Sequence, residues 1–170
     1  IILSNGNADK GAGVYVDEGA SLIVNSVKFI NNTAVTRGGA IYSEGNVAVN
    51  KAIFDGNDVT FRSKNVDNGG AAIYALGGKL TVADSNFTNN LKDYVVRGTD
   101  GKTGDLINAI ITTSAVTEIT GSRFVNNSGC YGGAIYAAVI DNVGTPSLVI
   151  RDSEFVNNTA YDGTIQIVDI

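Results

Sequence analysis

The feature that most constrains this chain is a repeat in which a Phe is followed, three residues later, by an Asn. The five copies are Phe29/Asn32, Phe54/Asn57, Phe87/Asn90, Phe124/Asn127 and Phe155/Asn158. Successive Phe residues lie 25, 33, 37 and 31 positions apart. Self-similarity with a period of a few tens of residues is typical of stacked units, each too small to bury its own apolar face. The repeat therefore predicts a solenoid whose fixed unit carries insertions of variable length.

A second signature, Gly-Gly-Ala-Ile-Tyr, recurs between the Phe repeats. It is intact at 38–42 and 132–136, gains one Ala at 69–74, and is degraded at 11–15, 104–108 and 162–166. Its apolar fourth position predicts an inward-facing column made of Val14, Ile41, Ile73, Ile107, Ile135 and Ile165. The Gly pairs are expected to supply positive φ angles or close backbone approach just before this column.

Period-2 alternation precedes each Phe and predicts a strand with one buried face. The residues seven and five positions before the Phe are Leu22/Val24, Val47/Val49, Leu80/Val82, Thr117/Ile119 and Leu148/Ile150. Since no segment has a helical period, successive units must pair in parallel and in register by wrapping around their own core. We predict an all-β solenoid of about five to six rungs, each with three short strands. At ~4.8 Å per rung it would be roughly 25–30 Å long.

The repeated Asn is expected to stand at a bend. Asn tolerates the left-handed backbone conformation, and its amide can bond to neighbouring backbone. Stacked at one corner, these amides can also bond from rung to rung as an Asn ladder. We therefore interpret both signatures as scaffold.

Repeated Gly-Gly-Ala-Ile combined with Phe-x-x-Asn resembles the repeats of chlamydial polymorphic outer membrane proteins and of adhesin-like surface proteins of methanogenic archaea and gut bacteria. The resemblance runs from about Gly11 to Ile170. It implies a right-handed, single-stranded parallel β-helix displayed on the cell surface, with a role in adhesion. The rung around 104–124 departs from the pattern, with Asn108 in place of Tyr and the polar Thr117 at an inward position.

The composition of the chain excludes some classes of binding partner. Charged residues make up 17% of the chain and the net charge is −5, which argues against nucleic acid because phosphates need a basic stripe. No apolar stretch is long enough to span a bilayer, so we expect no membrane insertion by this segment. We expect one β-helix domain over residues 1–170. The chain lacks an initiator Met, a signal segment and terminal caps. We therefore expect it to be a segment of a longer surface protein, with flanking domains or partner chains covering the solenoid ends.

Two insertions, Asp55–Asn68 and Leu91–Thr103, are where function is expected, because the core positions are committed to packing. Both follow the Phe-x-x-Asn corner and should project from the same edge. The predicted ligand-binding residues are Asp58, Phe61, Arg62, Lys64, Asp93, Tyr94, Arg97, Asp100 and Lys102. The alternative is that both insertions are solvated, variable loops.

An enzyme is the competing interpretation, since many β-helices cut acidic polysaccharides with Asp, Arg, Lys and bound Ca²⁺. Asp84 and Asp152 occupy equivalent positions, but ~9–10 Å of stacked rungs should separate them. Acidic residues of the first insertion offer Ca²⁺ the oxygen ligands it prefers, but not with the ligand spacing of a known site. The sequence therefore predicts no catalytic residues, no metal site and no cofactor.

Four Asn-x-Ser/Thr sequons are candidate glycosylation sites: Asn31, Asn86, Asn126 and Asn157. Three of them directly precede the Asn of the Phe-x-x-Asn motif, where Asn-Asn-Thr/Ser is also good turn chemistry. They are therefore either modification sites or by-products of the repeat.

The leading hypothesis is a non-catalytic extracellular module of a cell-surface adhesin that binds glycans or proteins of a host or neighbouring cell. The alternative is a polysaccharide-degrading β-helix, of lyase or hydrolase type. Ice binding would need a flat, regular Thr face, which the irregular outward positions do not provide.

Overall fold

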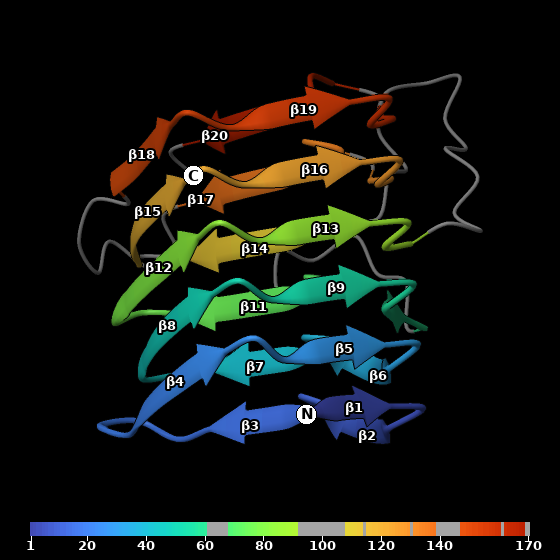
Figure 1. The fold of residues 1–170 in the computed structure, drawn as a ribbon, viewed down its shortest axis with the longest axis vertical. Helices are drawn as coiled ribbons and strands as arrows, with labels where there is room; N and C mark the ends of the chain where they lie inside the picture. Colours follow the sequence, from blue (N-terminus) through green and yellow to red (C-terminus); the bar gives the residue numbers. More distant parts are fainter. Residues whose placement is uncertain are drawn as a thin grey trace.

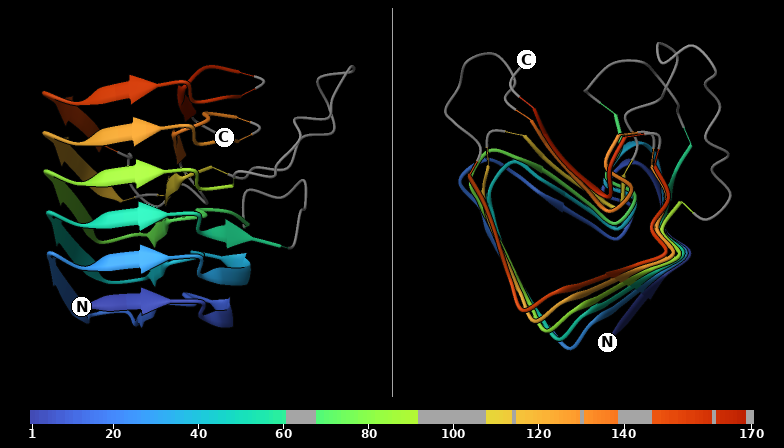
Figure 2. Two further views of the ribbon diagram at one scale, coloured as in Figure 1. Left: turned by 45° about the vertical axis from the view of Figure 1, so that its right-hand side comes forward. Right: turned by 90° about the horizontal axis from the view of Figure 1, so that it is seen from above.

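The computed structural model describes residues 1–60, 68–91, 108–113, 115–129, 131–138, 147–160 and 162–168. These residues form strands and turns, with no helix among them. The chain climbs from the N-terminal rung at the bottom of Figure 1 to the C-terminal rung at the top. Seen from above, the coil runs counterclockwise as it rises, so the β-helix is right-handed (Figure 2). About six rungs are stacked, as the repeat predicts.

Three long parallel sheets form the walls of the coil. The sheet that carries the repeated Phe, called here the Phe sheet, contains β1 (Ile2–Ser4), β5 (Lys28–Ile30), β9 (Ile53–Asp55), β13 (Asn86–Thr88), β16 (Arg123–Val125) and β19 (Glu154–Val156). The Tyr sheet, named after the last residue of Gly-Gly-Ala-Ile-Tyr, contains β3 (Val14–Val16), β7 (Ile41–Ser43), β11 (Ile73–Leu76), β14 (Ile110–Thr113), β17 (Ile135–Ala138) and β20 (Ile165–Val168). The Leu sheet contains β4 (Ser21–Asn25), β8 (Asn46–Asn50), β12 (Lys79–Ala83), β15 (Val116–Thr120) and β18 (Ser147–Arg151).

A fourth, short sheet lies between the Phe and Tyr sheets in the first three rungs. It contains β2 (Asn7–Lys10), β6 (Thr33–Arg37) and β10 (Asp58–Val59). The three-strand unit expected from the sequence is therefore extended by one strand in these rungs. The extra strand is too short for alternation to indicate it, since β10 has 2 residues and each segment offers one shared apolar position, at Ala8, Ala34 and Val59.

The repeated Phe residues form one continuous column in the core. Neighbouring rings are 4.6–4.8 Å apart between centroids and lie within 5° of parallel. The four lower rings, from Phe29 to Phe124, are at most 1% exposed, and Phe155 packs on top of them. Each Phe is paired in register with the next along the Phe sheet. The predicted Phe column is confirmed.

The register of the fourth rung corrects one predicted position. Ile110, and not Ile107, pairs with Ile73 below and with Ile135 above. The backbone agrees, since Ala71 donates to the carbonyl of Asn108. The insertion shifts the apparent motif by three residues, and Asn108 therefore takes the place of Ala71 instead of a Tyr. Ile107 itself lies outside the described residues.

Thr117 does face inward, as its alignment predicts. It pairs with Leu80 on one side and Leu148 on the other, and it is fully buried. Among the described residues, its hydroxyl has no hydrogen-bond partner, and neither do the side chains of Asn108 and Thr112. The described part of the fourth rung thus carries three buried polar side chains that lack a hydrogen-bond partner there.

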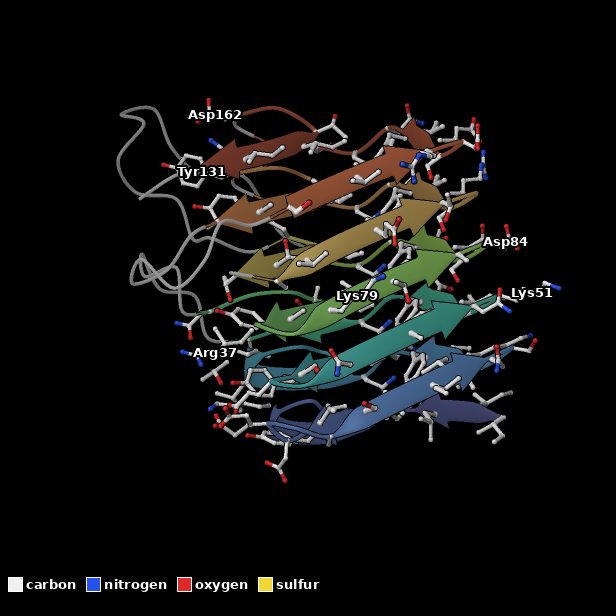
Figure 3. The ribbon with its side chains drawn as sticks, turned by 90° about the vertical axis from the view of Figure 1, so that its left-hand side faces the viewer. Arg37, Lys51, Lys79, Asp84, Tyr131 and Asp162 are labelled. Atoms are coloured by element: carbon white, nitrogen blue, oxygen red, sulfur yellow. The ribbon has the colours of Figure 1, made fainter. Side chains whose placement is uncertain are left out.

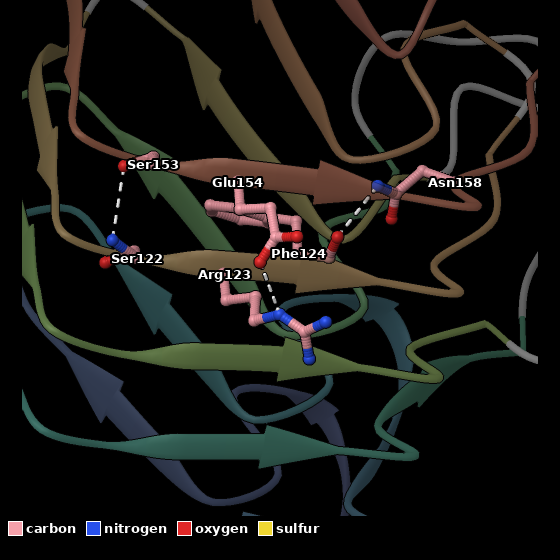
Figure 4. A network of polar contacts seen from close by, with 6 residues as sticks. All are labelled: Ser122, Arg123, Phe124, Ser153, Glu154 and Asn158. Atoms are coloured by element: carbon pink, nitrogen blue, oxygen red, sulfur yellow. Dashed lines mark hydrogen bonds and ion pairs between the residues drawn. The ribbon is translucent and has the colours of Figure 1, made fainter.

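The Asn column forms a directional hydrogen-bond ladder. The Oδ1 atom of Asn90 accepts from both the backbone N–H and Nδ2 of Asn57, each at 3.1 Å. Nδ2 of Asn90 donates downward to the carbonyl of Phe54 at 3.1 Å and upward to Oδ1 of Asn127 at 2.9 Å. The same pattern repeats up to Asn158, which donates to the Phe124 carbonyl (Figure 4).

The ladder prediction is confirmed, but the left-handed residue at this corner is the one before the ladder Asn. Asn31, Asn89, Asn126 and Asn157 have φ angles of 52–54°, and Gly56 takes this position in the third rung with φ 66°. Because the ladder amide must point into the stack, the preceding residue makes the turn. A shorter serine ladder bonds the opposite end of the Phe sheet, where the Ser122 N–H donates to Oγ of Ser153 (Figure 4).

Candidate binding surfaces

Asp58 is the one predicted ligand-binding residue that the structure describes. It lies in β10, half-buried, and its carboxylate accepts the N–H of Val59 at 2.8 Å. The start of the first insertion is thus a paired strand and not an open loop. The other eight predicted residues, Phe61, Arg62, Lys64, Asp93, Tyr94, Arg97, Asp100 and Lys102, lie outside the described residues.

The outer face of the Tyr sheet carries an aromatic cluster separate from the main core. Ile41 points inward, so its neighbour Tyr42 points outward, where it packs in one cluster with Tyr74 and Tyr136. Cations of the short sheet lie over these rings: Lys10 Nζ is 5.1 Å from the Tyr42 ring centroid, and Arg37 is 5.4 Å from that of Tyr74. The motif Tyr is therefore a packing residue that joins two sheets.

Burial governs the acidity of these phenols. Desolvation raises the pKa of Tyr136 to about 12. Desolvation also raises the pKa of Tyr42, helped by the hydrogen bond that its hydroxyl donates to Glu44 at 2.6 Å. Neutral, buried phenols with raised pKa values cannot serve as bases near neutral pH.

The outer face of the Leu sheet is turned toward the viewer in Figure 3, with Lys79 near its centre. It has a shallow, open hollow of about 410 Å³ across β4, β8 and β12. The hollow is lined by Ser21, Leu22, Ile23, Asn46, Val47, Ala48, Lys79 and Thr81. The sequence does not indicate this hollow, because the outward positions of these strands follow no motif. The available signal was a small residue, Ala48, between Ile23 and Thr81 in register.

Next to this hollow the same face is charged. Lys79 Nζ lies 3.3 Å from Glu118, and Arg151 Nη1 lies 3.6 Å from the other oxygen of the same carboxylate. On the neighbouring Phe sheet, Arg123 pairs with Glu154 at 2.6 Å (Figure 4). The partners in each ion pair neutralise each other's charge. Because all of these charged groups are at least 43% exposed, the pairs add little stability.

The four sequon residues Asn31, Asn86, Asn126 and Asn157 are all exposed. Three stand at the left-handed corner, whereas Asn86 lies within β13 and is paired on both sides. Asn126 and Asn157 occupy the same corner on successive rungs. Their use as glycosylation sites remains a prediction.

No group of three or more His, Cys, Asp or Glu side chains suited to a metal ion is found within the described ranges. Asp84 and Asp152 both stand at the exposed corner between the Leu and Phe sheets, with Gly121 in the corresponding position of the intervening rung. The described residues therefore bring together no constellation that suggests catalysis.

Residues 26–44, which cover most of the second rung, match the Chlamydia polymorphic membrane protein (Chlamydia_PMP) repeat. The chain is 30% identical over 152 residues to the probable autotransporter YfaL of Escherichia coli (strain K12). This match covers 85% of the chain but only 12% of that relative's length. No solved structure matches the chain significantly.

The chain is a right-handed β-helix, and its second rung resembles the Chlamydia polymorphic membrane protein repeat. The two similarities indicate a cell-surface or outer-membrane-associated location for this β-helix. Within its described part, no helix has the length and apolarity needed to cross a bilayer.

Proposed function

We propose that this β-helix is a non-catalytic extracellular module of a cell-surface adhesin, which binds glycans or proteins of a host or neighbouring cell. The observation that carries the proposal is the similarity to a probable autotransporter along 85% of the chain. The architecture supports it, since a stack of parallel rungs is a stiff support on which outward side chains and insertions vary freely.

The division of residues between core and surface also favours binding over chemistry. The repeated Phe and Ile side chains pack in the core, and the repeated Asn side chains bond to one another in the ladder. The chain contains no His, the commonest general acid and base. Binding is therefore assigned to the outer faces and to the two insertions, with Arg62, Lys64, Tyr94 and Arg97 as leading candidates.

The test is a pair of binding assays with the purified full chain. One uses a glycan array and the other uses fluorescently labelled protein on cultured host and bacterial cells. We expect saturable binding that weakens when Arg62 and Lys64, or Tyr94 and Arg97, are changed to Ala. The matched control changes Lys28 and Lys51, exposed charges on the β-helix body, to Ala.

Absence of binding on every array and cell type would refute the adhesin proposal and leave a spacer. A turnover assay on uronic-acid polymers, with and without Ca²⁺, tests the enzyme alternative. We expect no cleavage products, and sustained release of unsaturated or reducing ends would overturn the non-catalytic assignment.

A further inference from the structure

We infer that the hollow in the outer face of the Leu sheet is a subsite for one ring of a neutral sugar. This inference rests on the proposed adhesive function and names a site and ligand class for it. The hollow exists because Ala48 is the small central residue of an outward row, between Ile23 on β4 and Thr81 on β12. Its volume of about 410 Å³ is at the lower end of the range for small-molecule sites.

The lining has the mixed character that a sugar ring requires. Ile23, 74% exposed, and the Ala48 methyl give an apolar surface for the C–H face of a pyranose. The hydroxyls of Ser21 and Thr81 and Nδ2 of Asn46 stand at the hollow without a hydrogen bond to any described residue. Asn46 is held in place, since its Oδ1 accepts the Lys79 N–H at 3.0 Å. These free donors and acceptors match the hydroxyls around a sugar ring.

The charges favour a neutral ligand. Among the described residues of the lining, Lys79 is the one that is formally charged, and Glu118 lies 3.3 Å from its ammonium. An anionic sugar would have to compete with Glu118 for Lys79, and a cationic ligand would meet Lys79 itself. A neutral ring leaves the ion pair intact.

A peptide strand does not fit this face. β8 and β12 are each paired on both sides, so their backbone groups are used within the sheet. Strand addition needs a free sheet edge, and the hollow lies on a sheet face. A ligand here must therefore be recognised by side chains alone.

The test is a substitution whose larger side chain fills the hollow. Ala48→Phe places a ring where the sugar would lie, and the fold should be kept because the side chain points outward and Phe suits strands better than Ala. The control, Ala83→Phe, makes the same change on the same face outside the lining. The full chain and both variants are applied to an array carrying neutral, sialylated and sulfated oligosaccharides. The strongest neutral ligand is then titrated by calorimetry, and circular dichroism checks the fold.

We expect the full chain to bind neutral oligosaccharides, Ala48→Phe to weaken the interaction at least tenfold, and Ala83→Phe to change it less than twofold. Asn46→Ala should weaken it several-fold, whereas Asn50→Ala, outside the hollow, should not. Neutral-sugar binding that survives Ala48→Phe overturns this site but leaves the adhesin function standing. Binding only to sulfated or sialylated glycans, or only to cell-surface proteins, overturns the neutral-sugar class. Failure to bind any glycan or cell refutes both proposals.

Discussion

The most informative perturbation of the core is Thr117→Val, because it isolates one buried polar atom in an otherwise apolar column. Thr117 is fully buried between Leu80 and Leu148, and its hydroxyl has no hydrogen-bond partner in the part of the chain that the structure describes. Val has nearly the same shape, so the substitution changes polarity and leaves packing almost unchanged.

Two contributions set the expected rise in the free energy of unfolding of Thr117→Val. An unpaired buried hydroxyl costs about 1–3 kcal/mol relative to its hydrated state. Replacing it with a methyl group adds apolar contact worth up to about 0.8 kcal/mol. Since the unfolded chain retains some structure, part of this difference is lost. We expect the free energy of unfolding to rise by about 1–3 kcal/mol.

The assay is equilibrium urea unfolding followed by circular dichroism, comparing midpoints at an unchanged m-value. The control is Thr120→Val, on the same strand but facing outward, which should change the free energy by less than about 0.5 kcal/mol. A Thr117→Val protein that is no more stable than the parent, or less stable, would show that the hydroxyl is satisfied and that the inward register of β15 is misjudged.

Three further predictions concern the ladder, the phenols and the surface. Asn90→Ala should lower the free energy of unfolding by about 3 kcal/mol or more, because the buried groups that bond to the Asn90 amide lose a partner at about 1–3 kcal/mol each. Asn86→Ala, at an exposed position, is the control. Equal urea midpoints for the two variants would contradict the ladder. Because the pKa of Tyr136 rises from 10.0 to about 12 on burial, its contribution to stability is complete below pH 10 and is lost as the pH rises toward 12. Urea midpoints at pH 9, 10 and 11 should therefore fall less steeply in Tyr136→Phe than in the parent, and parallel curves would argue against burial of the phenol. Glu154→Gln should change the free energy of unfolding by less than about 1 kcal/mol, since the Arg123 pair is exposed; a larger loss in the same titration would mean that this pair is not solvent-screened.

The core columns were predictable because each rung repeats the same chemistry at the same place. Phe54 above Phe29, and Val49 above Val24, follow from alignment alone and agree with the observed register. Ile110 was misassigned as Ile107 because an insertion precedes it, and a shifted motif looks locally as plausible as the true one. The left-handed turn at Asn31 was placed one residue late because the sequence does not show which of two adjacent Asn residues points inward.

The binding surfaces were less predictable, for a physical reason. The outward positions of the Leu sheet follow no shared motif, unlike the repeated Tyr on the outer face of the Tyr sheet. The hollow at Ala48 depends on which residues lie beside it on neighbouring rungs, and this is known only once the register is fixed. Asp58 was expected in an open loop, but pairing of β10 with β6 makes it part of a strand.

Adhesion by the displayed protein tests the account most directly. The full chain, presented on the surface of a non-adherent bacterium, is compared with Ala48→Phe, with a variant carrying Ala in place of Arg62, Lys64, Tyr94 and Arg97, and with Ala83→Phe at equal display levels. The readout is the number of bacteria bound per host or neighbouring cell. We expect adhesion by the parent and by Ala83→Phe, and reduced adhesion by the other two. Adhesion no greater than that of the undecorated bacterium would contradict it.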